Sequence, residues 1–417
     1  MLTASSANVL DLRKDCEFSM RVTKAHWNES KSAWDITAGQ PGKEKHVTAK
    51  HVIFCLGFAS KLNFPAVKGL DQYKGQIRHS GDWPEGLEAE HFKGKKVAVV
   101  GSGASGVQIT QEIGPHVKEM SVFIRTPNLC LPMANYKLTP ESQEIFKDAY
   151  PDIFQKRWNT FAGFHYDFDY QPWDRHTPEE REAFYEAIWG RKGFHFWLET
   201  YVDVYFKKDA NRTAYDFWQK KTAPRIKNKE KREFLVPKEW PHTFGTVRPS
   251  LETSYFEVLD QDNVKVVNAK ADPIESFTEK GIRLKSGKEE DFDFIALATG
   301  FDTHTGGFKN IDIRGENGLP LSDKWKQGCN SYLGLTTHGF PNMFFLYGPH
   351  GPTAYTNGPS TVEIQAEWVC KAIDHLLKKN LKAIKPQQKA EEDFTQHIDD
   401  LSAATLFHES HGWYMGR

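Results

Sequence analysis

The stretch VAVVGSGASG, residues 97–106, places an apolar run directly before a glycine turn of the form G-x-G-x-x-G. A helical pattern, VQITQEIGPHV, follows the turn, and a second apolar run, MSVFIRT, follows the helical pattern. The glycine spacing alone is common by chance, but a strand, turn, helix and strand in this order are typical of dinucleotide-binding units. The sequence therefore predicts an α/β fold, and a purely structural glycine turn remains the alternative.

Each glycine of this turn has a predicted task. Gly101 permits the tight turn, Gly103 lets a pyrophosphate approach the backbone, and Gly106 allows the helix to pack closely on the strand. The helix N-terminus also offers free N–H groups and a partial positive charge to the phosphates. The predicted cofactor-binding residues here are Gly101, Ser102, Gly103, Ala104, Ser105, Gly106 and Gln108.

The end of the second strand predicts which nicotinamide cofactor is bound. An Asp or Glu at this place binds the ribose 2′-hydroxyl of NAD(H), whereas this chain has Arg125-Thr126. A cation and a hydroxyl suit a 2′-phosphate, so the sequence favours NADP(H). A surface ion pair is the alternative explanation for Arg125.

The rest of the chain alternates between strand and helix patterns. Residues 16–58 read as strands, residues 59–95 as a loop, and residues 136–240 as helices rich in charged and aromatic side chains. Thr139-Pro140 and Thr177-Pro178 are predicted helix starts. Strand signals return after residue 253, and a long amphipathic helix follows the run NMFFLYGPHGP. The aromatic cluster between Phe161 and Trp218 is interpreted as packing core rather than as a substrate pocket.

Composition narrows the class of protein. The formal net charge is −1 among 417 residues, and no Lys/Arg run resembles a nucleic-acid-binding arm. The five cysteines are scattered without a C-x-x-C pair, which argues against a disulfide framework or a zinc site and favours a reducing compartment. His408 and His411 are interpreted as solvated. No apolar run reaches the roughly 20 residues of a membrane span, so we expect a cytoplasmic protein.

A second motif lies just upstream of the glycine turn. Tyr73-x-Gly75-x-x-x-His79-x-x-x-Trp83-Pro84 resembles the fingerprint of Baeyer–Villiger monooxygenases, F-x-G-x-x-x-H-x-x-x-W-[P/D], with Tyr in place of Phe. The Trp-Pro ending separates this group from related flavin-containing monooxygenases. The resemblance covers nearly the whole chain, including the stretches FIRTPN, NRTAYDFW, FGTVRPSLETSYFEVLDQDNV, ALATGFDTHTG, GFPNMFFLYGP and GWYMG.

This resemblance implies an architecture and an activity. The fold would hold two Rossmann-like domains: a partial FAD-binding domain (1–72 and 290–417), a linker with the fingerprint (73–95), an NADP-binding domain (96–135 and 241–289) and a helical insertion (136–240). The implied enzyme uses FAD, NADPH and O₂ to insert oxygen next to the carbonyl of a small-molecule ketone, which gives an ester or lactone. The oligomeric state stays open.

The resemblance also implies functional residues. The family carries a G-T-K-R loop, which reads Gly245-Thr246-Val247-Arg248 here. Arg248 is the predicted catalytic residue, because a guanidinium stays charged and stabilises negative charge that develops on oxygen. Val247 replaces the Lys that helps to hold the 2′-phosphate, which leaves that task to Arg125 and Thr126. His79 is expected to couple domain motion to catalysis, with a structural histidine as the alternative, and the remaining predicted cofactor contacts are Thr299, Gly300, Asn357 and Trp413.

A larger departure from the family pattern concerns the flavin-binding motifs. A flavin-binding G-x-G-x-x-G unit and the fingerprint G-G-x-W…Y-P-G-x-x-x-D do not occur in it. We therefore expect an incomplete FAD domain, truncated at both ends, with exposed sheet edges and weak FAD binding. An N- or S-oxygenating flavin monooxygenase, or an inactive remnant that does not hold FAD, are the alternative functions.

Overall fold

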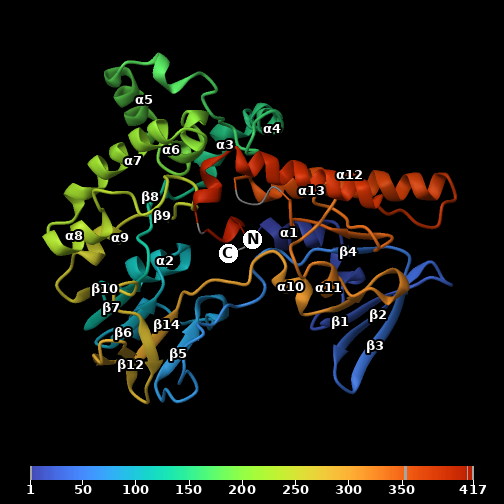
Figure 1. Cartoon of the computed structure of the whole chain (residues 1–417), viewed down its shortest axis with the longest axis horizontal. Helices are drawn as coiled ribbons and strands as arrows, with labels where there is room; N and C mark the ends of the chain where they lie inside the picture. Colours follow the sequence, from blue (N-terminus) through green and yellow to red (C-terminus); the bar gives the residue numbers. More distant parts are fainter. Residues whose placement is uncertain (1, 352–354, 411, 416–417) are drawn as a thin grey trace. The chain divides into compact units, whose positions relative to one another are not determined.

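A computed structural model describes residues 2–351, 355–410 and 412–415 of the chain (Figure 1). Internal contacts divide the chain into two compact units. The first unit comprises Met1–Ser60, His304–Thr353 and Thr361–Ile398, and the second comprises Lys61–Thr303, Ala354–Ser360 and Asp399–Arg417. All the residues that the sequence predicts to be functional belong to the second unit. The domain boundaries proposed from the sequence stay a prediction.

A five-stranded parallel sheet forms the centre of the second unit. Its strand order is β10-β7-β6-β14-β5, with the bounds Val264–Asn268, Glu119–Ile124, Lys96–Val100, Phe294–Leu297 and Gln76–His79. Helix α2 (Ala104–Ile113) follows β6, which confirms the predicted strand, turn, helix and strand. The register pairs Val100 with Phe123 and Leu297, and Leu297 with His79. The carboxyl ends of these strands therefore meet at one edge of the sheet.

The prediction of a loop over residues 59–95 is wrong in part. Strand β5 pairs in parallel with β14 and carries His79 as its last residue, and short 3₁₀ helices follow at Ser80–Asp82 and Ala89–Phe92. Strand β5 is only four residues long and is the outermost strand of the sheet. An outermost strand need not be continuously apolar, and the sequence Gln-Ile-Arg-His therefore carries no strand signal.

The predicted helical insertion is confirmed. Its helices are α3 (Pro140–Lys147), α4 (Tyr150–Trp158), α5 (Pro178–Gly190), α6 (His195–Leu198), α7 (Lys208–Thr222) and α8 (Lys229–Leu235). Thr139 and Thr177 each cap a helix through a capping box, with proline in the first turn. Most of the aromatic cluster is core, as interpreted, and six of its rings are at most 3% exposed: Tyr185, Phe196, Trp197, Tyr201, Phe217 and Trp218. Phe161, Tyr170 and Phe206 are exposed instead.

Two small sheets complete the second unit. The short strands β8 (Leu131–Pro132) and β9 (Leu251–Glu252) pair in parallel on either side of the insertion in sequence, and α9 (Tyr255–Leu259) follows β9. Strands β11 (Ile274–Phe277), β12 (Gly281–Leu284) and β13 (Glu289–Asp291) form an antiparallel sheet that the sequence analysis missed. Their alternating pattern lies between two predicted strands and is only three or four residues long in each case.

The first unit contains most of the predicted N-terminal strands. Strands β15 (Asp312–Arg314), β1 (Val22–Asn28), β2 (Ala33–Gln40) and β3 (Lys43–Ala49) form one sheet, and β16 (Met343–Phe345) pairs in parallel with β4 (Val52–Phe54). The buried side chains of Trp34, Phe308, Phe340 and Phe345 form its core. The remaining helices include α1 (Leu2–Val9), α10 (Gly306–Lys309), α11 (Leu321–Lys324), α12 (Gly358–Lys378) and α13 (Gln388–Ala403). Among the described helices of the chain, none is both long and apolar enough to cross a membrane.

Candidate cofactor and active site

Of the three glycines in the turn after β6, Gly101, Gly103 and Gly106, only Gly103 borders open space. Gly101 has a φ of 115°, and a Cβ there would lie 2.4 Å from the carbonyl oxygen of Ala298. A Cβ on Gly106 would lie 2.1 Å from the carbonyl oxygen of Gly101, so α2 packs against the turn without room for a side chain. Gly103, in contrast, is exposed, and a Cβ there would meet no atom within 4 Å. This geometry fits the diphosphate of a dinucleotide.

Arg125 and Thr126 lie directly beside this turn. They follow Ile124, the last residue of β7, and the Gly101 N–H donates to the Phe123 carbonyl at 3.0 Å. Both side chains are exposed. Among the residues that the structure describes, no hydrogen bond or ion pair engages the Arg125 guanidinium, which leaves it able to contact a 2′-phosphate.

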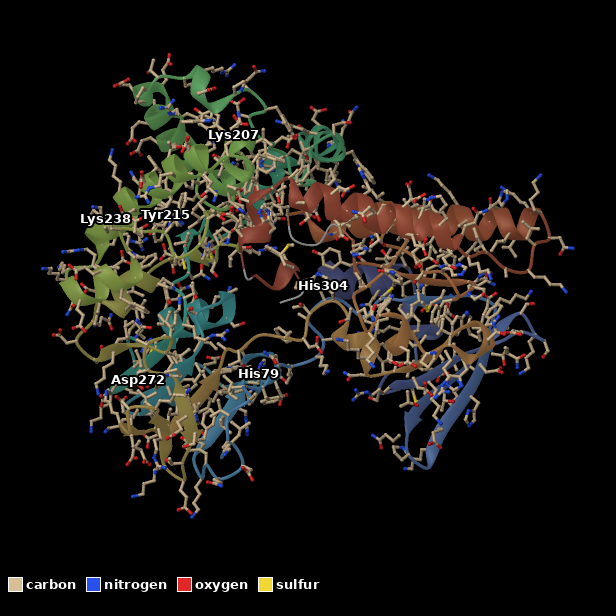
Figure 2. The ribbon with its side chains drawn as sticks, viewed as in Figure 1. His79, Lys207, Tyr215, Lys238, Asp272 and His304 are labelled. Carbon is tan, nitrogen blue, oxygen red and sulfur yellow. The ribbon has the colours of Figure 1, made fainter. Side chains whose placement is uncertain are left out.

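His79 is almost fully buried at the same edge of the sheet (Figure 2). Its Nδ1 accepts a hydrogen bond from the Gly81 N–H at 3.0 Å, so the neutral ring carries its proton on Nε2. The rings of Phe64 and Phe301 lie 5.3 and 5.7 Å from it. Burial lowers the pKa of His79, and the nearby carbonyls of Gly300 and Asn63 partly oppose that shift.

Thr299 and Gly300 bind a neighbouring backbone segment rather than pointing freely outward. The Thr299 hydroxyl donates to the Asn63 carbonyl at 2.6 Å, and the Asn63 N–H donates to the Gly300 carbonyl at 3.0 Å. Leu62 and Phe301 form an antiparallel bridge next to these bonds. The turn after β14 is therefore held beside His79.

The loop Gly245–Arg248 is held in place by two side chains of the helical insertion and by Tyr355. The Gly245 carbonyl accepts from the Trp197 indole at 3.0 Å and from the Tyr355 hydroxyl at 2.7 Å. Asn211, on α7, bonds both the N–H and the carbonyl of Phe244, at 2.7 and 2.9 Å. Trp197 and Asn211 of the insertion thus fix the backbone just before Arg248.

Arg248 itself is half-buried against aromatic rings. The central carbon of its guanidinium lies 5.0 Å from the centre of the Phe194 ring and 5.6 Å from that of Trp197. Such cation–π contacts orient a guanidinium while its N–H groups remain on the edge of the plane. The loop therefore presents a fixed cation of the kind that stabilises a developing oxyanion.

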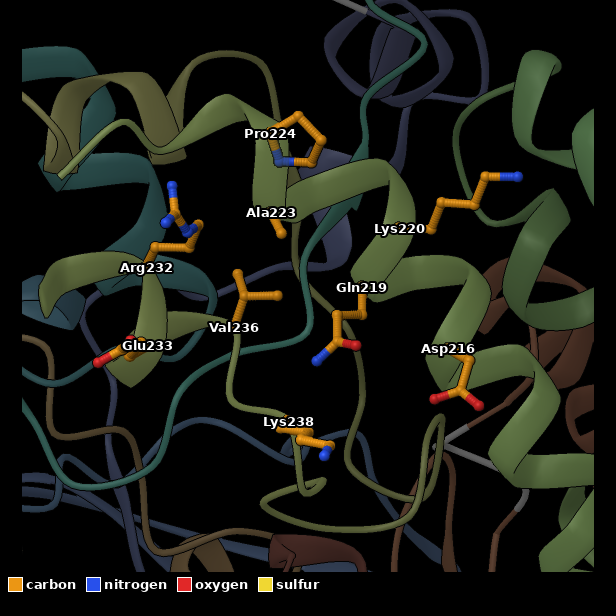
Figure 3. A pocket seen from close by; sticks show the side chains of 9 residues that line it. All are labelled: Asp216, Gln219, Lys220, Ala223, Pro224, Arg232, Glu233, Val236 and Lys238. Carbon is orange, nitrogen blue, oxygen red and sulfur yellow. The ribbon is translucent and has the colours of Figure 1, made fainter. Parts of the chain in front are cut away.

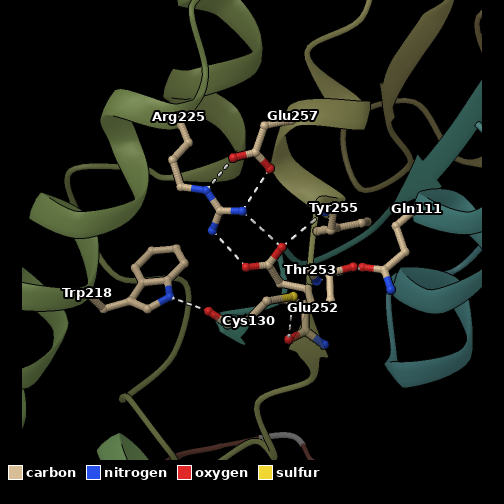
Figure 4. Close-up of polar contacts among 9 residues, drawn as sticks. Gln111, Cys130, Trp218, Arg225, Glu252, Thr253, Tyr255 and Glu257 are labelled. Atoms are coloured by element: carbon tan, nitrogen blue, oxygen red, sulfur yellow. Dashed lines mark hydrogen bonds and ion pairs between the residues drawn. The ribbon is translucent and has the colours of Figure 1, made fainter. Parts of the chain in front are cut away.

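The segment after Arg248 is tied down by three more side chains. The Ser250 N–H donates to Asn128 at 3.1 Å, and the Thr253 N–H donates to Gln111 of α2 at 3.0 Å. Glu252, with 1% of its side chain exposed, forms a two-pronged ion pair with Arg225 (Figure 4). Sequence reasoning did not single out Asn128, Arg225 or Asn211. Only the stretches FIRTPN and NRTAYDFW, which contain two of them, offered a signal.

The other predicted contacts are placed as follows. Gln108 is exposed on α2. A Cβ on Gly412 would lie 3.6 Å from a methyl of Val247, so the C-terminal segment reaches the loop Gly245–Arg248. The Asn357 side-chain oxygen accepts from the Ser360 N–H at 3.2 Å. The side chain of Trp413 and all of His411 lie outside the described part of the chain, and His408 is exposed.

Comparison of the chain with known proteins identifies its family. Residues 3–135 match the family described as FMO-like, flavin-binding monooxygenase-like. Cyclopentanone 1,2-monooxygenase of Comamonas sp. is 38% identical over 409 residues, which are 98% of this chain and 73% of that protein. A Baeyer–Villiger monooxygenase of Pseudooceanicola batsensis is 34% identical over 414 residues, which cover 98% of this chain and 73% of the relative. The chain belongs to the Baeyer–Villiger monooxygenase family.

A solved structure of this family agrees with the fold. OTEMO in complex with FAD and NADP superposes with a TM-score of 0.93 at 35% identity, over 98% of this chain and 77% of that one. Two Rossmann-like domains with a helical insertion are thus the architecture of the chain, as the sequence predicted.

The two cofactors of a Baeyer–Villiger monooxygenase fit the described residues to different degrees. The turn Gly101–Gly106 fits NADP(H), because Gly103 leaves space for a diphosphate at the start of α2. In the first unit, the buried amide nitrogen of Gln365 lies next to Gly351 and has no hydrogen-bond partner among the described residues, so it is able to donate to a ligand. Within the described residues of that unit, however, no helix follows a strand through a second G-x-G-x-x-G turn, so the first unit fits FAD only in part.

A separate groove of the second unit lies away from these residues. It encloses about 660 Å³ between α7 and the stretch around α8 (Figure 3), and it is lined by Asp216, Gln219, Lys220, Ala223, Pro224, Arg232, Glu233, Val236 and Lys238. None of these residues belongs to the predicted site. Its lining carries both acidic and basic side chains.

Proposed function

We propose that this chain catalyses the NADPH- and flavin-dependent insertion of one oxygen atom of O₂ next to a ketone carbonyl, giving an ester or lactone. The observation that carries the proposal is the guanidinium of Arg248, held over Phe194 and Trp197 on a loop that the insertion fixes from one side and the glycine-turn region from the other. Two relatives are named for the cyclic ketones cyclopentanone and cyclohexanone and a third for acetone, so a ketone is the proposed substrate class.

Each part of this site has a distinct task. The glycine turn and the first turn of α2 bind the cofactor diphosphate, and Arg125 with Thr126 receives the 2′-phosphate. Bound flavin supplies the activation of O₂. Arg248 stabilises the negative charge that develops on the reacting oxygen atoms, and the rings beneath it exclude water and hold the guanidinium in place.

Product analysis with variants of Arg248 tests this function. The protein is supplied with FAD, NADPH and a cyclic ketone, and the ester formed per NADPH consumed is measured. Arg248→Ala should keep NADP⁺ binding and lose about 10²- to 10³-fold in ester formation, with hydrogen peroxide released instead. Arg248→Lys should recover only part of the loss, because an ammonium cannot present a planar fork.

Arg212 provides a matched control. Its guanidinium also lies over two rings, 5.5 Å from the centres of both Tyr215 and Trp240, but it pairs with Asp216 on the surface of α7. Arg212→Ala should leave the ester yield unchanged. If Arg248→Ala couples NADPH to ester as the parent does, the catalytic role is refuted. A thioether oxidised in place of the ketone would favour the N- or S-oxygenating alternative.

A further inference from the structure

Asn128 makes an unusually complete set of hydrogen bonds between two parts of the site. Its Nδ2 donates to the Ser102 carbonyl at 3.0 Å and to the Ser250 hydroxyl at 2.9 Å. Its Oδ1 accepts from the Ser250 N–H at 3.1 Å and from the Cys130 thiol at 3.4 Å. Both donors and the acceptor of the amide are therefore in use, which fixes the orientation of this side chain.

The bond to Ser102 has a consequence for the glycine turn. The Ser102 carbonyl and the Gly103 N–H belong to one planar trans peptide, so they point in opposite directions. Because Asn128 holds the carbonyl, the Gly103 N–H is directed away from Asn128. Gly103 is exposed, and a Cβ there would meet no atom within 4 Å. The hydroxyl of Ser102 supports the same arrangement by donating to the Thr126 carbonyl at 2.9 Å.

The bonds to Ser250 connect this peptide to the catalytic loop. Ser250 is buried and lies two residues after Arg248, with the rigid Pro249 between them. Its carbonyl accepts from the Leu131 N–H at 2.8 Å, so Ser250 is held on both sides by the segment that contains Asn128. The glycine turn and the backbone next to Arg248 are thereby connected through one side chain.

We propose that Asn128 is a positioning residue that aims the Ser102–Gly103 peptide at the cofactor diphosphate and joins it rigidly to the Arg248 segment. Asn128 acts through these neighbours and does not itself contact the reacting atoms. The inference rests on the proposed function, because it requires that the glycine turn hold the diphosphate of NADP(H).

Binding of two probes to the 417-residue chain tests this role without flavin or turnover. NADP⁺ contains both the diphosphate and the 2′-phosphate, whereas adenosine 2′-monophosphate contains only the latter. By calorimetric titration, Asn128→Ala should weaken NADP⁺ about ten- to thirtyfold and leave adenosine 2′-monophosphate within about twofold, since one oriented hydrogen bond to a charged group is lost. Arg125→Ala should instead weaken both probes.

Asn263 supplies the matched control. Its amide also donates two hydrogen bonds to backbone carbonyls, those of Gly114 and Val117, both at 3.1 Å, but it precedes β10 at the opposite end of the parallel strands. Asn263→Ala should destabilise the fold to a similar extent without changing the ratio of the two affinities. Equal weakening of NADP⁺ in both variants would overturn the proposal and leave Asn128 a structural residue.

A second variant, Asn128→Asp, and the binding of the parent chain complete the test. If Asn128→Ala does not fold, Asn128→Asp preserves the shape and the acceptor for the Ser250 N–H but loses the donor to Ser102. It should lower the affinity for NADP⁺ relative to adenosine 2′-monophosphate, and an unchanged ratio would refute the proposal. A parent chain that binds neither probe would overturn the proposed function together with this inference, whereas a binding parent with an unchanged Asn128→Ala variant would overturn the inference alone.

Discussion

At the scale of single residues, Gly103 and Gly106 belong to one motif but have opposite surroundings. A Cβ on Gly103 meets only open space, and its φ of −71° suits any residue, whereas a Cβ on Gly106 would overlap the Gly101 carbonyl at 2.1 Å. Gly103→Ala should therefore keep the stability of the parent within about 0.5 kcal/mol and weaken NADP⁺ binding. Gly106→Ala should cost about 1–3 kcal/mol, because the helix must move away from the turn.

Urea unfolding and NADP⁺ titration of the two variants measure this difference. Val107 sits beside Gly106 on α2 but is an ordinary buried side chain, so Val107→Ala serves as a control for loss of packing alone. A Gly103→Ala variant that binds NADP⁺ like the parent would place the diphosphate elsewhere.

Arg125 is the proposed determinant of the preference between the two nicotinamide cofactors. Arg125→Ala should raise the KM for NADPH about ten- to hundredfold, because a charge-assisted contact to the 2′-phosphate is worth about 1.5–3 kcal/mol. The KM for NADH should change little, since NADH lacks that phosphate. Steady-state kinetics with both cofactors provide the comparison, and equal losses would show that Arg125 does not read the 2′-phosphate.

At the scale of elements, Arg225 joins the helical insertion to the segment after Arg248. It pairs with the buried Glu252 of β9 and with Glu257 of α9, at 2.7 Å in each case. Arg225→Met should lower the free energy of unfolding by about 3–5 kcal/mol, because it leaves a buried carboxylate without its partner. Thermal and urea unfolding measure the loss.

An exposed pair gives the comparison for Arg225. Arg283 and Glu289 contact each other at 2.9 Å across β12 and β13, with more than a third of each side chain exposed. Arg283→Met should cost at most about 1 kcal/mol. If Arg225→Met is equally mild, the ion pair does not hold the insertion. Adding Glu252→Gln to Arg225→Met should recover part of the stability, since the uncompensated charge is removed.

At the scale of the whole molecule, five partly or largely buried histidines make stability depend on pH. Burial lowers the pKa of His51, His79, His165, His242 and His304, so the folded chain favours their neutral forms. The unfolded chain takes up protons as the pH falls through about 6.5. Stability should therefore be highest above that pH and decrease toward pH 5.5.

Urea unfolding at pH 7.5, 6.5 and 5.5 tests this dependence. The variant His242→Gln removes one of the five groups and should reduce the slope between pH 6.5 and 5.5. A chain that becomes more stable on acidification would contradict the assignment, because the sign follows directly from neutral histidines in the folded state.

The sequence by itself determined the elements whose signals are local. The apolar run before Gly101 and the spacing of the glycines predicted β6, the turn, α2 and β7, since a central parallel strand is continuously apolar and a tight turn requires glycine. Thr139 and Thr177 predicted their helices because a capping hydroxyl acts within three residues. The fingerprint around His79 likewise indicated the family before any geometry was known.

Only the tertiary structure decided how the site is held together. Asn128 and Ser250 are 122 residues apart, Arg225 and Glu252 are 27 apart across two elements, and Asn63 meets Thr299 across 236 residues. Strand β5 was missed for the same reason, because its pairing with β14 is what makes Gln-Ile-Arg-His a strand. Hydrogen bonds of this kind depend on which segments the packed sheet and insertion bring together, and neither propensity nor periodicity within a short window records that.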